Sequence, residues 1–281
     1  MPNSFKVDDI LFEDNEAIAN VFNDYFIESN IFVDEIDVSI NEHEFNYNLT
    51  HTIPVHVYET QGADIFEFEI VSQDTVMKLL SNLDTNKSVG LDGIGASFLR
   101  NAKEEISSNL TKLINMSLNS GIYPIDWKSA MVKPLFKKGD MQSIINYRPI
   151  SVLPVVSKII EKIVHKQLYD YLSSHKVLND SQFGFRPGHS TSSALGSMTD
   201  NWLRAIDDGQ IIGSIFIDLR RAFDTVDTKL LLIKLHKISC SEITIKWFDS
   251  YLNNRIQRVA VRDSLSNERP LSLGVPQGSI L

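Results

Sequence analysis

Apolar side chains recur every three or four positions over much of the chain, and each such stretch predicts an amphipathic helix. The first helix is expected over residues 14–29, where Asp14 or Asn15 can cap its start, and the second begins after Ser72. A long stripe over residues 96–119 stops near Gly121. Further helical stripes follow over residues 156–172, 194–202, 230–235 and 245–252.

Other stretches have the composition of strands and turns. Residues 130–136 and 147–153 predict the arms of a β-hairpin whose turn is Lys137-Lys138-Gly139-Asp140. A second hairpin is predicted from residues 257–262 against 269–273. Residues 30–65 show no clear period and are expected to be a loop-rich connector. The pattern as a whole indicates an α+β protein.

Residues 213–219 predict a buried strand that ends on a carboxylate. Five of these seven residues are apolar or Gly and they do not alternate, which favours a central strand covered on both faces. A buried, ionised Asp218 persists only if it is paired, hydrogen-bonded or bound to a metal, and a hard cation such as Mg²⁺ takes oxygen ligands. An Asp at the end of a strand can also cap the next helix. The segment alone leaves both interpretations open.

Charge is distributed unevenly along the 281 residues, whose net charge is −9. Residues 1–80 hold 2 basic and 17 acidic residues, so residues 81–281 hold 27 − 2 = 25 basic and 36 − 17 = 19 acidic residues, a balance of +6. This second part includes a basic stretch that suits a phosphate-facing surface, although a solvated helix and loop would look the same. The stretch comprises Lys128, Lys133, Lys137, Lys138, Arg148, Lys158, Lys162 and Lys166.

The first hairpin carries candidate chemistry at its tip and on its return arm. Arg148 can grip phosphate oxygens in a bidentate manner, and Lys137 or Lys138 adds a point charge, so the hairpin can hold a triphosphate. A surface hairpin with ordinary basic residues is the alternative. The single cysteine, Cys240, excludes an internal disulfide and suits a reducing compartment. No apolar run approaches the roughly 20 residues that span a bilayer, and the N-terminus lacks a secretory signal.

Several blocks together resemble the reverse transcriptases of non-LTR retrotransposons of the jockey type. In the first catalytic block of that family an Asp on a palm strand, here Asp218, is followed five residues later by an aromatic side chain, here Phe223. The continuation Ala222-Phe223-Asp224-Thr225-Val226-Asp227 is similar to the jockey version. Three other blocks occur in the family's order: Arg148-Pro149-Ile150-Ser151, residues 182–191 and residues 274–281. An earlier block, residues 86–94, has Leu91 where a Pro often stands.

The resemblance implies roles for individual residues. Asp218 and the Leu219 carbonyl would bind metal, and Asp218 would be catalytic. Lys137 and Arg148 would hold the triphosphate of the incoming nucleotide. Phe223 would act as a steric gate against a ribonucleotide's 2′-hydroxyl.

Further residues would position the template and the nascent pair. Gln277 would lie beside the incoming nucleotide, while Gly184, Arg186 and Gly278 would contact the template strand. For Asp224 and Asp227 a helix-capping role is favoured over additional metal ligation.

The activity implied is RNA-directed DNA synthesis. The partners would be an RNA template, a DNA primer and deoxynucleoside triphosphates, with two Mg²⁺ ions as cofactors and no membrane. The family supplies two more carboxylates from an aromatic-x-Asp-Asp hairpin after the Gln277 block, and the 281 residues contain none there. We therefore expect a fragment that is inactive by itself. The alternative is a catalytically inactive RNA-binding or structural remnant of a retroelement. An intracellular location is expected, in nucleus or cytoplasm, rather than secretion.

The expected organisation follows from these assignments. Residues 1–76 would form an acidic helical and linker region, and residues 77–281 a reverse transcriptase domain. The predicted fold is the α+β fold of a right-hand polymerase, with fingers, a partial palm and a helical N-terminal extension.

Overall fold

The computed structural model describes residues 1–2, 4–7, 10–31, 64–219, 222–271 and 273–281. The chain divides into two compact units, one made of residues 1–168 with 221–281 and the other of residues 169–220. Most of the loop-rich connector predicted over residues 30–65 lies outside the described residues.

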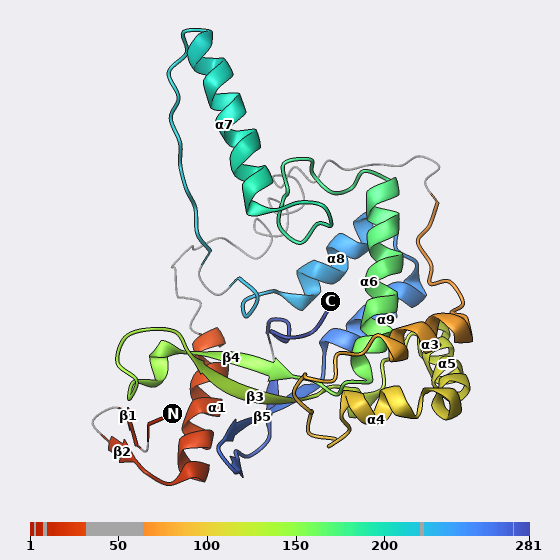
Figure 1. Ribbon diagram of the computed structural model, residues 1–281, viewed down its shortest axis with the longest axis vertical. Helices are drawn as coiled ribbons and strands as arrows, with labels where there is room; N and C mark the ends of the chain where they lie inside the picture. Colours follow the sequence, from red (N-terminus) through yellow and green to blue (C-terminus); the bar gives the residue numbers. More distant parts are fainter. Residues whose placement is uncertain (3, 8–9, 32–63, 220–221, 272) are drawn as a thin grey trace, which may run out of the picture. The chain divides into compact units, whose positions relative to one another are not determined.

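A mixed β-sheet forms the centre of the first unit, as Figure 1 shows. Its strand order is β4-β3-β5-β6, where β3 spans Ser129–Phe136, β4 Tyr147–Val152, β5 Arg255–Val261 and β6 Ser264–Leu265. Strand β7 (Arg269–Leu271) also pairs with β5. Strands β3 and β4 are antiparallel, and β5 runs parallel to β3 and antiparallel to β7, so both predicted hairpins are confirmed.

Helix α1 (Asn15–Ile31) packs against this sheet. Asp14 caps its start, because its Oδ2 accepts the Ala17 N–H at 2.8 Å. The helix contributes Ile18, Ala19, Phe22 and Phe26 to a buried cluster with Val132, Tyr147, Val259 and Val261 of the sheet. The short hairpin of β1 (Phe5–Val7) and β2 (Ile10–Phe12) adds Phe5 to the same cluster. The N-terminal region thus supplies part of the core of this unit.

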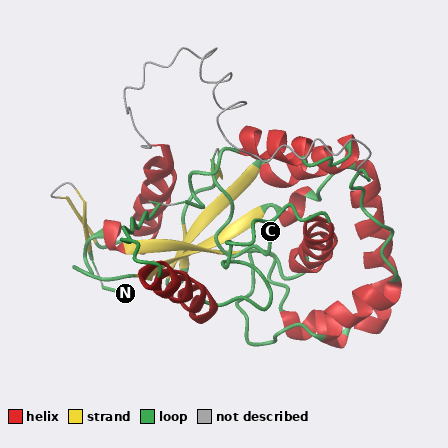
Figure 2. Ribbon diagram, turned by 90° about the horizontal axis from the view of Figure 1, so that it is seen from above, coloured by secondary structure: helices red, strands yellow, loops and turns green. Residues whose placement is uncertain are grey.

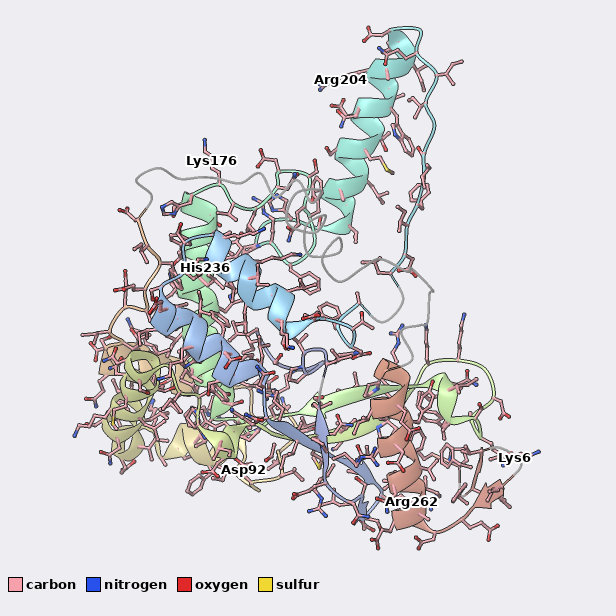
Figure 3. All side chains as sticks on the ribbon, turned by 180° about the vertical axis from the view of Figure 1, so that it is seen from behind. Lys6, Asp92, Lys176, Arg204, His236 and Arg262 are labelled. Atoms are coloured by element: carbon pink, nitrogen blue, oxygen red, sulfur yellow. The ribbon has the colours of Figure 1, made fainter. Side chains whose placement is uncertain are left out.

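Polar contacts also join α1 to the sheet. Asn23 is buried: its Nδ2 donates to Ser266 Oγ and to the Asn267 carbonyl, both at 2.9 Å, and its Oδ1 accepts from Gln257 Nε2 at 2.9 Å. Beyond the end of β5, Arg262, labelled in Figure 3, donates to Asn15 Oδ1 at 2.9 Å and to the Pro2 carbonyl at 3.0 Å. The buried amide of Asn23 is therefore satisfied on both sides.

A second core lies among the helices of the first unit, which Figure 2 shows in red. These helices are α3 (Gln73–Ser81), α4 (Ala96–Asn101), α5 (Lys103–Ser120), α6 (Ser157–Ser174), α8 (Thr228–Lys237) and α9 (Glu242–Leu252). Trp247 of α9 is fully buried, stacks on Tyr251 and donates its indole N–H to Ser117 Oγ at 3.0 Å. The helix predicted over residues 96–119 is divided at Ala102, and it ends at Gly121 in the left-handed conformation (φ 69°).

The second unit contains helix α7 (Thr191–Asp207), which begins with a capping box between Ser190 and Ser193. Its Arg204, labelled in Figure 3, forms an ion pair with Asp200. Besides α7 and the last residues of α6, the described part of this unit is loop and extended chain. None of the described helices, in either unit, has the length and apolarity needed to cross a membrane.

Candidate functional site

Residues 274–279 lie along the open edge of β4. The Ser151 N–H donates to the Gln277 carbonyl at 2.8 Å, which continues the hydrogen bonding of the sheet beyond its edge strand. Gly278 approaches β4 so closely that a Cβ there would overlap the Ser151 carbonyl oxygen, and its φ is +137°. Only Gly combines this approach with this backbone conformation.

Residues 223–226 hold the same segment from another side. The Gly274 N–H donates to the Val226 carbonyl at 3.0 Å, and the Val275 N–H donates to the Phe223 carbonyl at 2.9 Å. Gly274 has a φ of +79°, and a Cβ on it would lie 2.6 Å from the Asp224 carbonyl oxygen. The two segments therefore pack backbone against backbone, about fifty residues apart in the sequence.

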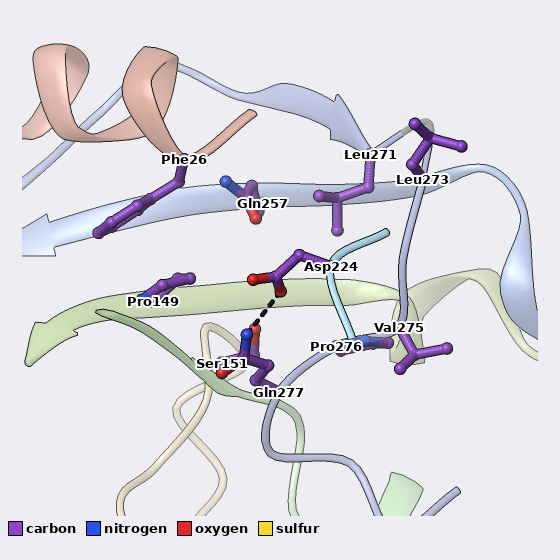
Figure 4. A pocket seen from close by; sticks show the side chains of 10 residues that line it. All are labelled: Phe26, Pro149, Ser151, Asp224, Gln257, Leu271, Leu273, Val275, Pro276 and Gln277. Carbon is purple, nitrogen blue, oxygen red and sulfur yellow. Dashed lines mark hydrogen bonds between the residues drawn. The ribbon is translucent and has the colours of Figure 1, made fainter. Parts of the chain in front are cut away.

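The Gln277 side chain is fixed by a carboxylate. Its Nε2 donates to Asp224 Oδ1 at 2.6 Å, the contact drawn as a dashed line in Figure 4. The favoured capping role of Asp224 was wrong, because its carboxylate binds an amide 53 positions away rather than a helix end. Asp227 does cap a helix, α8, by accepting the Leu230 N–H at 3.0 Å.

A small pocket opens beside this hydrogen bond. Its walls come from β4, α1, β5, β7 and the segment after β7, as Figure 4 shows. The lining residues are Phe26, Pro149, Ser151, Asp224, Gln257, Leu271, Leu273, Val275, Pro276 and Gln277. Phe223, half exposed at 48%, directly precedes Asp224 in the chain. The structure thus assembles Phe223, Gln277 and Gly278 in one place.

The predicted triphosphate ligands lie on the exposed face of the hairpin. Arg148 is exposed and lies opposite Leu135, and Lys137 and Lys138 are exposed just after β3. Because successive side chains of a strand point to opposite faces, Arg148 points away from the face on which Pro149 and Ser151 line the pocket. The hairpin therefore has a basic face and a pocket-lining face.

One member of the predicted basic surface is not on the surface. Lys128 is only 6% exposed, and its Nζ donates to the Asn253 carbonyl at 3.2 Å. Burial, together with the nearby charge of Arg255, lowers the pKa of Lys128. The sequence could not show this, because whether a Lys is covered depends on which distant residues the fold brings to it.

The strand predicted over residues 213–219 is wrong. In the structure this stretch is extended chain outside any strand, and Ile215, Phe216, Ile217 and Leu219 are all more than 70% exposed. Asp218 is exposed as well. The apolar composition is that of a strand, but a strand forms only where a neighbouring strand accepts its hydrogen bonds.

The other residues of the second unit with expected roles lie in a turn. Arg186 donates from Nη1 to the Asn179 carbonyl at 2.8 Å, so its guanidinium binds its own loop. Gly184 would meet nothing within 4 Å if it carried a Cβ. The open surroundings of Gly184 leave room for another chain to approach.

The sequence analysis missed two buried charged residues. Glu161 of α6 and Arg255 of β5 are 0% and 1% exposed. Burial raises the pKa of Glu161, while the Ile280 N–H and the charge of Arg255 oppose that shift. The one available signal was that Ser157 and Glu161 lie four positions apart, beside the apolar stripe of α6.

Within the described residues, no group of three or more Asp, Glu, His or Cys side chains comes together as a metal-binding cluster. Asp218 has the oxygen donors that a hard cation prefers, but among these residues it does not belong to a group of three or more such side chains.

Sequence comparison with known proteins identifies one family and several related polymerases. The profile of the family described as "Reverse transcriptase (RNA-dependent DNA polymerase)" matches residues 136–281. The chain is 29% identical over 255 residues to the "Probable RNA-directed DNA polymerase from transposon BS" of Drosophila melanogaster, covering 90% of this chain and 28% of that protein. It is 30% identical over 212 residues to the "RNA-directed DNA polymerase from mobile element jockey" of Drosophila melanogaster, covering 75% of this chain and 23% of that protein. The chain thus spans about a quarter of the length of these curated relatives.

Proposed function

The chain belongs to the reverse transcriptase family, and we propose that it forms the nucleotide-binding part of an RNA-directed DNA polymerase of a non-LTR retrotransposon. The reaction would join a deoxynucleoside triphosphate to the 3′-hydroxyl of a DNA primer, with release of pyrophosphate, under the direction of an RNA template. The mixed sheet with its helices would correspond to fingers and part of a palm.

The observation that carries the proposal is the placement of the 274–278 segment. Backbone hydrogen bonds to Ser151, Phe223 and Val226 hold it, and Asp224 fixes the Gln277 amide. Such a rigid arrangement is what nucleotide positioning requires, because phosphoryl transfer depends mainly on positioning and on charge stabilisation. Gln277 would contact the incoming nucleotide, and the ring of Phe223 would exclude a 2′-hydroxyl.

We propose further contacts for individual residues. Lys137 and Arg148, on the exposed face of the hairpin, would bind the triphosphate, which would then lie outside the pocket that Gln277 lines. Gly184, Arg186 and Gly278 would contact the template strand. For Arg186 this requires that its guanidinium keep a donor available beyond its bonds to Asn179 and Gln182.

The family uses divalent metals, and Mg²⁺ would be the ion here. Its ligands would include the Asp218 carboxylate and the Leu219 carbonyl. The described residues do not complete such a site, since no cluster of three ligand side chains forms among them. Further carboxylates from elsewhere in the polymerase would be needed.

A catalytically inactive RNA-binding remnant is the second candidate. The exposure of Asp218 and of the apolar residues around it favours this candidate, because a catalytic carboxylate works in a site that limits access of water. Nucleotide binding separates the two, since a remnant that only holds RNA has no need to select deoxynucleotides.

The test measures the affinity for the next complementary deoxynucleoside triphosphate, by titrating it into the 281-residue chain bound to an RNA template and a DNA primer. We expect Gln277→Ala and Arg148→Ala to weaken nucleotide binding by about tenfold, the value of one or two hydrogen bonds. Gln73→Ala is the control, because Gln73 bonds to Ser107 on α5 and not to the 274–279 segment. Equal nucleotide affinity in the wild type and in all three variants would refute the assignment of this site.

A further inference from the structure

The carboxylate of Glu161 contacts the segment that carries Gln277. Glu161 is fully buried on α6, and its Oε2 accepts the Ile280 N–H at 2.9 Å. Its Oε1 accepts a hydrogen bond from Ser157 Oγ at 3.3 Å, one turn earlier on the same helix. A side chain of helix α6 thus reaches a backbone group three residues beyond Gln277.

This contact is made at an energetic cost. An ionised carboxylate loses its hydration on burial, and only a compensating charge and hydrogen bonds offset that cost. Burial accordingly raises the pKa of Glu161. A leucine would avoid the desolvation of the carboxylate, but it could not accept the Ile280 N–H and would leave the buried Arg255 without its counter-charge.

Arg255 supplies the opposite charge nearby. Its guanidinium lies 5.0 Å over the Tyr251 ring, and its Nη1 donates to the Tyr251 carbonyl at 2.8 Å. Its Nε and Nη2 are buried and make no hydrogen bond to any described residue. Arg255 therefore compensates the charge of Glu161 through space and leaves both carboxylate oxygens to Ser157 and Ile280.

The Ile280 contact closes one end of the segment. Ser279 folds the chain back, because its N–H and Oγ both bond to the Pro276 carbonyl, at 3.1 and 2.9 Å. On one side of this turn Gln277 is held by Ser151 and Asp224, and on the other side Ile280 is held by Glu161. Without Glu161 the Ile280 N–H would lose this acceptor.

We propose that Glu161 is a positioning residue, whose buried carboxylate fixes the turn at residues 276–280 and thereby keeps Gln277 and Gly278 seated against Ser151. The significance of this position rests on the proposed function of Gln277. The contact itself can be tested without any catalysis.

The experiment is hydrogen exchange of the Ile280 and Ser151 amides in the full 281-residue chain. Glu161→Leu removes the acceptor, Glu161→Asp withdraws it by one methylene, and Glu161→Gln retains it without charge. We expect exchange at both amides to accelerate at least about tenfold in the Leu and Asp variants and to stay within about threefold of wild type in the Gln variant. Ile160→Val, also fully buried on α6, is the control for a general loss of packing.

Each outcome decides the proposal. Unchanged exchange in the Leu or Asp variant overturns it, as does acceleration of the same size in Ile160→Val. If the Leu and Asp variants do not fold, the Gln variant decides: retained protection at Ile280 supports an acceptor role, and lost protection overturns it. Confirmed exchange effects combined with absent nucleotide binding would refute the proposed function while leaving the positioning role of Glu161 intact.

Discussion

Replacing Gly278 by Ala should release the 274–279 segment from β4. A Cβ at this position would overlap the Ser151 carbonyl oxygen, which is backbone and cannot rotate away, and the φ of +137° suits Gly alone. The segment must therefore either leave β4 or hold a strained conformation.

The size of the effect follows from the strain in the closed state. A non-Gly residue in this backbone region costs about 1–3 kcal/mol, which favours by that amount the open state in which the 2.8 Å hydrogen bond from Ser151 to Gln277 is broken. This corresponds to roughly a fivefold to 150-fold loss of protection. Because the segment can detach locally, we expect this loss at the Ser151 amide and little change in the unfolding of the α1–sheet core.

The assay is native-state hydrogen exchange of the Ser151 amide, compared with the amides that pair β3 with β5. Gly184→Ala is the matched control, since a Cβ there meets nothing within 4 Å. Unchanged protection of Ser151 in Gly278→Ala would refute the close packing of the segment on β4. A loss of the same size in Gly184→Ala would refute its local origin.

Three further predictions concern stability and reactivity. Asn23→Ala should lower the free energy of unfolding by about 2–4 kcal/mol in urea denaturation, because it removes three hydrogen bonds and leaves the buried Gln257 amide without its Asn23 acceptor. Asn20→Ala removes one exposed bond to the Asn267 N–H and should cost less than about 1 kcal/mol. Folding raises the pKa of Glu161, so above pH ~4.3 the folded chain binds more protons than the unfolded chain, and the free energy of unfolding should decrease as pH rises from there to the raised pKa. Glu161→Gln should lack this decrease. The same dependence of the free energy of unfolding on pH in both proteins would contradict the prediction. Burial raises the pKa of Cys240 to about 12, so its thiol should react with a thiol reagent only after unfolding, and rapid labelling of the native chain would show that this position is open.

Local sequence patterns were enough for most elements of the first unit. The hairpin of β3 and β4 was predictable because strand composition flanks a Gly-containing turn, and Ser72, Asp14 and Asp227 mark their helix starts by side-chain capping. The grouping of Phe223 with Gln277 came from the family resemblance rather than from any local pattern. The structure supports it through the hydrogen bond from Val275 to Phe223.

The errors arose where the outcome depends on distant partners. Residues 213–219 have strand composition, but composition does not supply a neighbouring strand. Asp224 looks like a capping residue because it precedes a helix, and only the fold brings Gln277 to it. Glu161 looks like a solvated residue between Lys158 and Lys162, and its burial becomes visible only when Ile280 and Arg255 are placed in space.

The proposed function assigns these residues to the nucleotide site of an RNA-directed DNA polymerase. The most direct test is primer extension on an RNA template by a chimaera in which residues 70–281 replace the matched part of the Drosophila melanogaster jockey polymerase. We expect the chimaera to synthesise DNA. Asp218→Asn should abolish this synthesis, Arg148→Ala should weaken it mainly through a higher KM for nucleotide, and Phe223→Val should extend it to ribonucleotides. Synthesis that persists in Asp218→Asn, or unchanged sugar selection in Phe223→Val, would contradict the claim.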